Sequence, residues 1–328
     1  MRIVRPRRLG GALGACGALA LACASCTDVR LAKYRDDRLL DSYHYALGEE
    51  YVDAGGLKLC YQEHGVGPAV LILPGLGTNI DFWQLNIPAL AEDHHVLAVD
   101  LPGLGKSDKP DAGYDLLWMC DRIVAFLDAQ QVPRVSIIGG SLGGHLGLLL
   151  ALNHPERVEK LVIMGSTGAW PPPHLLLELG LKLLWNEALV TDYVRTHWDD
   201  VYRLMFLHET ELTRALYRRQ MALRANGSRY APEGRALARA LRSIFYHSCR
   251  RRLPDVHIPV LLIWGEKDEI HPPEDALYLR RRLPNARLVI VPGAAHEVMV
   301  DQPDTFNRIV RDFLAAGTAG VADSLTPR

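Results

Sequence analysis

The segment Gly139-Gly-Ser-Leu-Gly143 places a serine between glycines in the pattern G-x-S-x-G. It follows the apolar run 135–138 and leads into the apolar stretch 142–153, the setting of a serine on a sharp turn from strand to helix. Such a turn strains the backbone and holds the hydroxyl clear of the sheet. The pattern predicts Ser141 as a nucleophile, and the N–H of Leu142, at the helix N-terminus, as an oxyanion-hole donor. A glycine-rich loop that only binds an anion is the alternative.

A nucleophilic serine needs a general base, and His296 stands on a short loop after the apolar run 288–291 near the end of the chain. Asp268 follows the run 260–264 in the same way. Both side chains are therefore expected at the edge of the sheet where Ser141 lies. Asp268 would orient the His296 ring and stabilise the imidazolium. The order serine, acid, histidine is one in which catalytic triads occur.

Other titratable residues lie close to these positions in the sequence. Glu266 and Glu269 flank the expected acid, and His271 follows it by three residues. His145 lies one helical turn past the expected nucleophile. Neither histidine lies on a loop long enough to join the nucleophile to the acid, so we expect both to be structural or to line a pocket.

Short apolar runs alternate with helical stretches along most of the chain. A hairpin is expected at 51–62 around Gly55-Gly56, followed by strands at 69–73, 95–99, 135–138, 161–164, 260–264 and 288–291. Helices are expected at 114–130, 142–153, 275–283 and 304–316. This alternation predicts an α/β fold with a doubly wound, mostly parallel sheet. The loop after the strand 69–73 would supply the second oxyanion donor, the N–H of Leu76.

The interval between the strands 161–164 and 260–264 is far longer than one crossover helix requires. Its amphipathic pattern predicts a helical cap at 174–252, inserted into a core formed by 49–173 and 253–316. The cap is rich in arginine, and we expect a solvated helix face there rather than a site for an anionic partner. Four aromatic residues are expected either to line an apolar pocket or to form the core of the cap: Trp170, Trp185, Trp198 and Phe206.

Two further segments carry a resemblance. They are Asp100-Leu-Pro-Gly-Leu-Gly-Lys-Ser-Asp108 and the turn His154-Pro-Glu-Arg-Val158. With the G-x-S-x-G turn they resemble the large α/β-hydrolase family, which includes esterases, lipases and carbon–carbon bond hydrolases. The resemblance covers about 49–314 except for the cap. Members usually carry His-Gly where this chain has Pro74-Gly75, but a backbone donor does not depend on that side chain.

These features together predict acyl transfer to water, with a small-molecule or lipid carboxylic ester as the expected substrate. Cleavage of a carbon–carbon bond in a diketone, of an amide or of a lactone is the alternative within the fold, and a non-catalytic binding protein is the alternative outside it. A serine nucleophile argues against haloalkane dehalogenases and epoxide hydrolases, which would carry aspartate. The sequence contains no metal-ligand cluster or dinucleotide fingerprint, so no metal or cofactor is expected.

Composition excludes some partners and leaves others open. The formal net charge is -1, and no basic face dominates, so nothing indicates nucleic acid as a partner. Oligomeric state cannot be read from the sequence. Outside the leader the cysteines are Cys60, Cys120 and Cys249, which we expect to be buried thiols, although one pair could form a disulfide in an oxidising compartment.

The first 26 residues form a separate leader. Four arginines precede an uncharged stretch, 9–24, that is too short to span a membrane and typical of an export signal. The leader ends at Cys26, which resembles the lipidated cysteine of bacterial lipoproteins. Cys23 is the other candidate for lipidation. A signal that is simply cleaved and an anchor that is not cleaved are the alternatives. We expect export and a membrane-anchored lipoprotein on the periplasmic or outer side, or otherwise a periplasmic or secreted protein. A tether at 27–48 and a disordered tail at 317–328 complete the expected organisation.

Overall fold

The computed structural model describes residues 48–166, 168, 186–225 and 230–316. The leader with its two candidate cysteines, almost all of the tether, the tail, Trp170 and Trp185 lie outside them, as does the side chain of Trp198. The described residues all belong to one unit of the chain, 36–328.

The described strands form one eight-stranded sheet in the order β1-β2-β4-β3-β5-β6-β7-β8. The strands are β1 (Glu50–Asp53), β2 (Lys58–His64), β3 (Ala69–Leu73), β4 (His95–Val99), β5 (Val135–Gly140), β6 (Val158–Met164), β7 (Val260–Gly265) and β8 (Ala286–Val291). Pairing is antiparallel for β1 with β2 and for β2 with β4, and parallel from β4 to β8. The prediction of a mostly parallel sheet in an α/β fold is confirmed.

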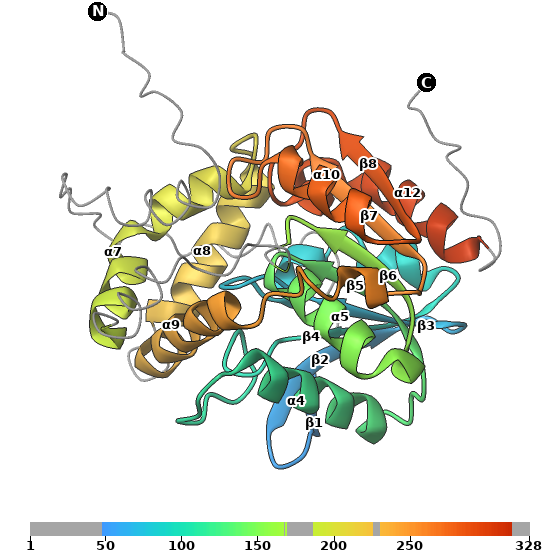
Figure 1. The fold of residues 1–328 in the computed structure, drawn as a ribbon. Helices are drawn as coiled ribbons and strands as arrows, with labels where there is room; N and C mark the ends of the chain where they lie inside the picture. The colour runs from blue at the N-terminus through green and yellow to red at the C-terminus, as the bar shows by residue number, and fades with distance from the viewer. Residues whose placement is uncertain (1–47, 167, 169–185, 226–229, 317–328) are drawn as a thin grey trace, which may run out of the picture. The chain divides into compact units, whose positions relative to one another are not determined.

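Both faces of the sheet are covered by helices (Figure 1), because its central strands are apolar on both sides. On β3, Leu71 and Leu73 point into one core cluster and Val70 and Ile72 into the other. The first cluster includes residues of α4 (Leu116–Ala129), α5 (Leu142–Asn153) and α10 (Pro273–Arg282). The second includes residues of α3 (Ile87–Ala91), α11 (Val298–Asp301) and α12 (Pro303–Ala315).

Three long helices stand between β6 and β7, and the described part of this interval contains no strand. They are α7 (Glu187–Met205), α8 (Glu211–Ala225) and α9 (Tyr230–Tyr246), grouped together to one side of the sheet in Figure 1. The structure also contains short 3-10 turns at Ile80–Trp83 (η2), Pro155–Arg157 (η3) and Leu253–Asp255 (η4), and η4 lies in this same interval, just before β7. None of the described helices is long and apolar enough to cross a membrane.

The expectation of a solvated charged face on these helices is wrong at two positions. Glu233 of α9 is buried, with Lys109 of the core 3.8 Å from its carboxylate. Arg219 of α8 pairs at 3.0 Å with Asp81, a buried residue of η2. Charges at these positions join the helices to the core, and a buried carboxylate requires such a partner.

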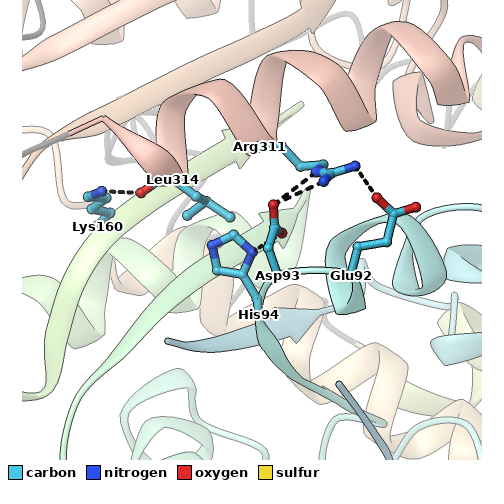
Figure 2. A network of polar contacts seen from close by, with 6 residues as sticks. All are labelled: Glu92, Asp93, His94, Lys160, Arg311 and Leu314. Atoms are coloured by element: carbon cyan, nitrogen blue, oxygen red, sulfur yellow. Dashed lines mark hydrogen bonds and ion pairs between the residues drawn. The ribbon is translucent and has the colours of Figure 1, made fainter. Parts of the chain in front are cut away.

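Charged side chains fix the C-terminal half of helix α12, as Figure 2 shows. Arg311 donates to Glu92 at 2.6 Å and to Asp93 at 3.0 Å. The buried ammonium of Lys160, on β6, donates to the carbonyl oxygens of Leu314 at 2.5 Å and Ala316 at 2.7 Å. A positive charge at a helix C-terminus satisfies carbonyls that the helix itself leaves without partners.

Replacing Lys160 by Met is expected to destabilise the fold without affecting chemistry. Two carbonyls, one buried and one partly buried, lose a charged donor. This loss costs about 2 kcal/mol, or roughly 4–8 °C in melting temperature. Lys160 stands near the start of β6, at the opposite end from the site described below. Thermal unfolding should show the loss, with the exposed Lys267→Met as the control. An unchanged melting temperature for Lys160→Met would contradict this role.

The three cysteines in the described residues are free and buried. Burial raises the pKa of the Cys60 and Cys249 thiols to about 12. They are protonated at neutral pH, which fits the expectation of buried thiols rather than nucleophiles.

Candidate active site

Ser141 occupies a strained turn between β5 and α5. Its backbone has φ 49° and ψ -110°, a left-handed conformation that is costly for a residue with a side chain. The flanking glycines permit the turn: a Cβ on Gly139 would lie 2.4 Å from the Gly143 backbone, and one on Gly143 would lie 2.0 Å from the Leu73 carbonyl oxygen. Leu142 is the first residue of α5, so its N–H lies at the positive end of the helix.

Asp268 and His296 form a buried hydrogen-bonded pair. His296 Nδ1 lies 3.0 Å from Asp268 Oδ2, and the other carboxylate oxygen accepts from the N–H groups of Ile270 and His271 at 3.0 and 2.8 Å. Burial alone would lower the pKa of His296, but the charge and the hydrogen bond of Asp268 outweigh it and raise the pKa. The imidazolium is therefore stabilised relative to an isolated buried histidine.

Gly165, directly after β6, is the point where the serine and this pair come together. The Ser141 N–H donates to the carbonyl oxygen of Met164 at 2.8 Å. A Cβ on Gly165 would lie 2.5 Å from His296 Cε1, 2.6 Å from His296 Nδ1 and 3.2 Å from Asp268 Oδ2. Because β5, β6, β7 and β8 are consecutive in the sheet, all three predicted triad residues gather at the carboxyl ends of neighbouring strands.

The loop that carries Leu76 lies against the serine from the other side. A Cβ on Gly75 would lie 3.2 Å from Ser141 Cβ, so the next backbone N–H, that of Leu76, belongs to the immediate surroundings of Ser141. The buried Asp100 holds the end of this loop by accepting from Ile80 N–H at 2.9 Å and Lys106 N–H at 2.7 Å. Asp100 thus fixes the end of the loop that carries Leu76.

The other acidic residues and histidines near the predicted triad do not take the place of Asp268 or His296. Glu266 and Glu269 are exposed, so neither replaces Asp268 as the partner of the histidine. His145 is buried with Nε2 2.7 Å from the His247 carbonyl oxygen, and burial lowers its pKa to about 4. His271 is buried 5.5 Å from the His296 ring, between ring centroids, and has Asp275 3.5 Å from its Nδ1.

Asp301 of α11 is a residue of this site that the sequence did not reveal. Its Oδ2 accepts from the N–H of Ala295 at 2.8 Å, directly before His296, and both oxygens accept from the N–H of Leu207 at 3.1 Å. The N–H of Glu297 donates to the carbonyl oxygen of Met205 at 2.9 Å. The backbone on both sides of His296 is therefore joined to the end of α7.

Phe206 follows α7 directly and lies between Met205 and Leu207, the two residues that contact the backbone around His296. It is buried and stacks on Phe82 of η2, with ring centroids 6.1 Å apart and an interplanar angle of 15°. Of the four aromatic residues expected to line a pocket or to form the core of the cap, Phe206 is the one whose packing is described, and it lies in the interior. The end of α7 thus contacts both the histidine loop and the turn that follows the oxyanion loop.

Replacing Gly165 by Ala is expected to lower kcat/KM by about 100-fold, because the new methyl group would force the imidazole to move by about 1 Å. A residue with a side chain is also strained at φ 45°. Ester turnover measures the first effect and thermal unfolding the second. Gly113→Ala is the matched control, since nothing lies within 4 Å of a Cβ there. Full activity in Gly165→Ala would show that His296 does not pack against this glycine.

Replacing Asp301 by Ala is expected to lower kcat by about 10- to 100-fold, because two N–H groups lose their acceptor and the loop before His296 is released. Asp301→Asn keeps one acceptor oxygen and should lose less. Asp304→Ala, an exposed aspartate of α12, is the control. Turnover by the two Asp301 variants equal to that of the control would contradict a positioning role.

The described residues contain no group of three or more His, Cys, Asp or Glu side chains arranged to hold a metal ion.

Comparison with known proteins points to one fold family. The family model described as alpha/beta hydrolase fold matches residues 68–303. The chain is 30% identical over 286 residues to 2-hydroxymuconate semialdehyde hydrolase of Pseudomonas sp. strain CF600, covering 83% of this chain and 95% of that protein. It is 28% identical over 263 residues to pimeloyl-[acyl-carrier protein] methyl ester esterase of Aeromonas hydrophila, covering 79% and 100%.

A solved structure shares the architecture over more of the chain. The crystal structure of a membrane phospholipase A, described as a bacterial virulence factor, superimposes with a TM-score of 0.64 at 26% identity and covers 92% of each chain. These proteins act, by their names, on different substrates.

Proposed function

Because the chain belongs to the α/β-hydrolase fold family, we propose that it is a serine hydrolase that cleaves a carboxylic ester of a small molecule or lipid. The observation that carries the proposal is the arrangement at the end of β6: the strained Ser141 turn donates its N–H to Met164, and the His296 imidazole and the buried Asp268 carboxylate pack against the next residue, Gly165. A catalytic triad is recognised by such geometry and roles rather than by sequence position.

In the proposed first step Ser141 Oγ attacks the ester carbonyl carbon and His296 takes its proton. The oxyanion of the tetrahedral intermediate is bound by the N–H groups of Leu142 and Leu76. Asp268 holds the imidazole by its Nδ1 and stabilises the imidazolium. His296 then gives the proton to the departing alcohol, which leaves an acyl-serine.

Water completes the cycle in the proposed second step. His296 removes a proton from the water as it attacks the acyl carbon, and a second tetrahedral intermediate forms in the same hole. Its collapse returns the proton to Ser141 Oγ and releases the carboxylic acid. Every proton in the scheme moves between substrate, water and the described side chains, so the proposal requires neither metal nor cofactor.

An ester is favoured as the substrate by two of the similar proteins. One is a methyl ester esterase by name, and another is a phospholipase A by name. A third is a semialdehyde hydrolase by name and so is not an ester hydrolase by name. Carbon–carbon bond, amide and lactone cleavage are the alternatives within the same site.

A panel of chromogenic esters with acyl chains of graded length tests this proposal. We expect turnover that peaks at one range of chain lengths and disappears in Ser141→Ala. Matched amide, lactone and diketone substrates are run beside the esters. Faster turnover of any of these than of every ester would replace the ester by that substrate class, while the serine mechanism would remain.

We also propose that the leader exports the protein and that Cys26 carries a lipid anchor. The support is the cationic start, the short apolar stretch and the cysteine that ends it. A multiply acylated cysteine anchors stably, at about 0.8 kcal/mol per buried CH2. The full chain should then sediment with bacterial membranes and require detergent for release.

The cysteine variants separate the two candidates for lipidation. Cys26→Ser should release the protein or block its processing, and Cys23→Ser should not. A soluble full chain would rule out the anchor, and mass spectrometry of the mature N-terminus would identify the cleavage. A version of the chain that starts at Asp28 should keep esterase activity.

A further inference from the structure

A pocket of about 610 Å³ lies between the end of α9, the segment that follows it and α10. Its charged lining residues are Arg250, Arg251 and Arg282, and no acidic residue lines it. The rest of the lining is aromatic apart from Ser248. None of the residues placed above at the carboxyl ends of the strands belongs to this lining, so the pocket is separate from the candidate active site.

Two of the arginines are held in position by one aromatic ring. The Arg250 guanidinium lies 4.4 Å and that of Arg282 lies 5.4 Å from the ring centroid of Tyr278, both within cation–π range. The two positive charges are therefore at most about 10 Å apart, within roughly one Debye length of each other. A negative charge bound between them would offset their repulsion.

The protein itself does not supply that negative charge within the residues that the structure describes. No ion pair reaches the guanidinium of Arg250, Arg251 or Arg282 there, whereas Arg219 and Arg239 pair with carboxylates at 3.0 and 2.6 Å. The net charge of the chain is -1, so the uncompensated positive charge is a local property of this pocket.

The Tyr278 hydroxyl adds a second unsatisfied group at the same place. It is buried and has no hydrogen-bond partner in the described part of the chain. Leaving a buried hydroxyl unpaired costs about 1–3 kcal/mol. Tyr278 thus lacks a hydrogen-bond partner for its hydroxyl, and the two arginines beside its ring lack a negatively charged partner.

We propose that this arginine pocket binds the phosphate group of an anionic ligand. The guanidinium fork matches phosphate oxygens in bidentate geometry and is weakly hydrated, which makes arginine suited to phosphate recognition. The aromatic walls offer apolar surface to the part of the ligand that carries the phosphate. A soluble phosphate ester and a phospholipid headgroup share this chemistry, and the experiment below separates them.

The test measures binding to the full chain and does not depend on catalysis. Inorganic phosphate is titrated calorimetrically and by thermal unfolding, with chloride at equal ionic strength as the reference. We expect saturable binding and a higher melting temperature with phosphate. The double variant Arg250→Gln/Arg282→Gln should bind at least tenfold more weakly.

The matched control removes the same number of positive charges, both from α10. Arg280 and Arg281 stand in the last turn of α10 but do not line the pocket, so Arg280→Gln/Arg281→Gln should bind phosphate as the unmodified protein does. Equal weakening in both double variants, or an equal response to chloride, would overturn the proposal. Ester turnover by the variants is a separate readout, so failure here would leave the proposed function untouched.

Two further arms identify the source of the phosphate. Vesicles of phosphatidylglycerol are compared with vesicles of phosphatidylcholine, and glycerol phosphate is titrated in solution. If the protein binds vesicles more tightly than glycerol phosphate, and this binding requires Arg250 and Arg282, the pocket is assigned to a lipid headgroup. Glycerol phosphate binding without vesicle binding assigns it to a soluble phosphate ester.

Discussion

Ser141→Ala and His296→Ala are each expected to lower kcat by about 10⁴- to 10⁶-fold, and the double variant to lose little more than either one. The physical reason is that the nucleophile and its base act in the same step. Once the hydroxyl is gone, the imidazole has no proton to remove, and without the imidazole the hydroxyl is a weak nucleophile. Residual turnover would come from the oxyanion hole and from substrate binding.

Steady-state kinetics on the best ester of the panel measures these losses. Circular dichroism and thermal unfolding should show that each variant is folded, and the exposed His257→Ala should retain full activity. Losses that multiply in the double variant would contradict the account, because independent residues give additive free energies. Both residues would then have to be assigned other roles.

Asp268→Asn is expected to lower kcat by about 10⁴-fold, because an amide at this place favours the wrong imidazole tautomer. The pH profile should move as well. In the unmodified protein Asp268 raises the pKa of His296, and only the neutral imidazole can act as base. The profile of kcat/KM should therefore rise with pH through an inflection above the ordinary value of 6.5.

In the Asp268→Asn variant the charge is gone and burial remains. Since burial lowers the pKa of His296, the inflection should fall to a lower pH. Glu266→Gln and Glu269→Gln are the matched controls, because both carboxylates are exposed neighbours, and they should leave rate and profile nearly unchanged. A larger loss in either control than in Asp268→Asn would place the catalytic acid elsewhere.

The elements around the nucleophile could be predicted because their signals are local. Strand β3 and helix α5 have the bounds that their apolar runs indicate. Strand β6 begins at Val158, before the expected start at Leu161. The apolar pattern did not predict this extension because it contains the polar Lys160. Lys160 can be buried there because its ammonium donates to carbonyl groups at the end of α12, which are distant in sequence.

The contacts that position the catalytic groups could not be predicted, because their partners are distant along the chain. Gly165 carries no motif, and its requirement for glycine follows from the ring of His296 that a Cβ would meet. Asp301 lies five residues past His296, but its second partner is Leu207 at the end of α7. The arginine pocket likewise depends on the meeting of α9 with α10.

Labelling with a fluorophosphonate probe tests the central claim most directly, because the probe phosphonylates only a serine that a base has activated. We expect stoichiometric labelling that mass spectrometry assigns to Ser141 and that disappears in Ser141→Ala. Labelling should be strongly slowed in Gly165→Ala, where the imidazole is displaced. A folded protein that takes up no probe, or takes it up at another serine, would contradict the account and favour a non-catalytic binding protein.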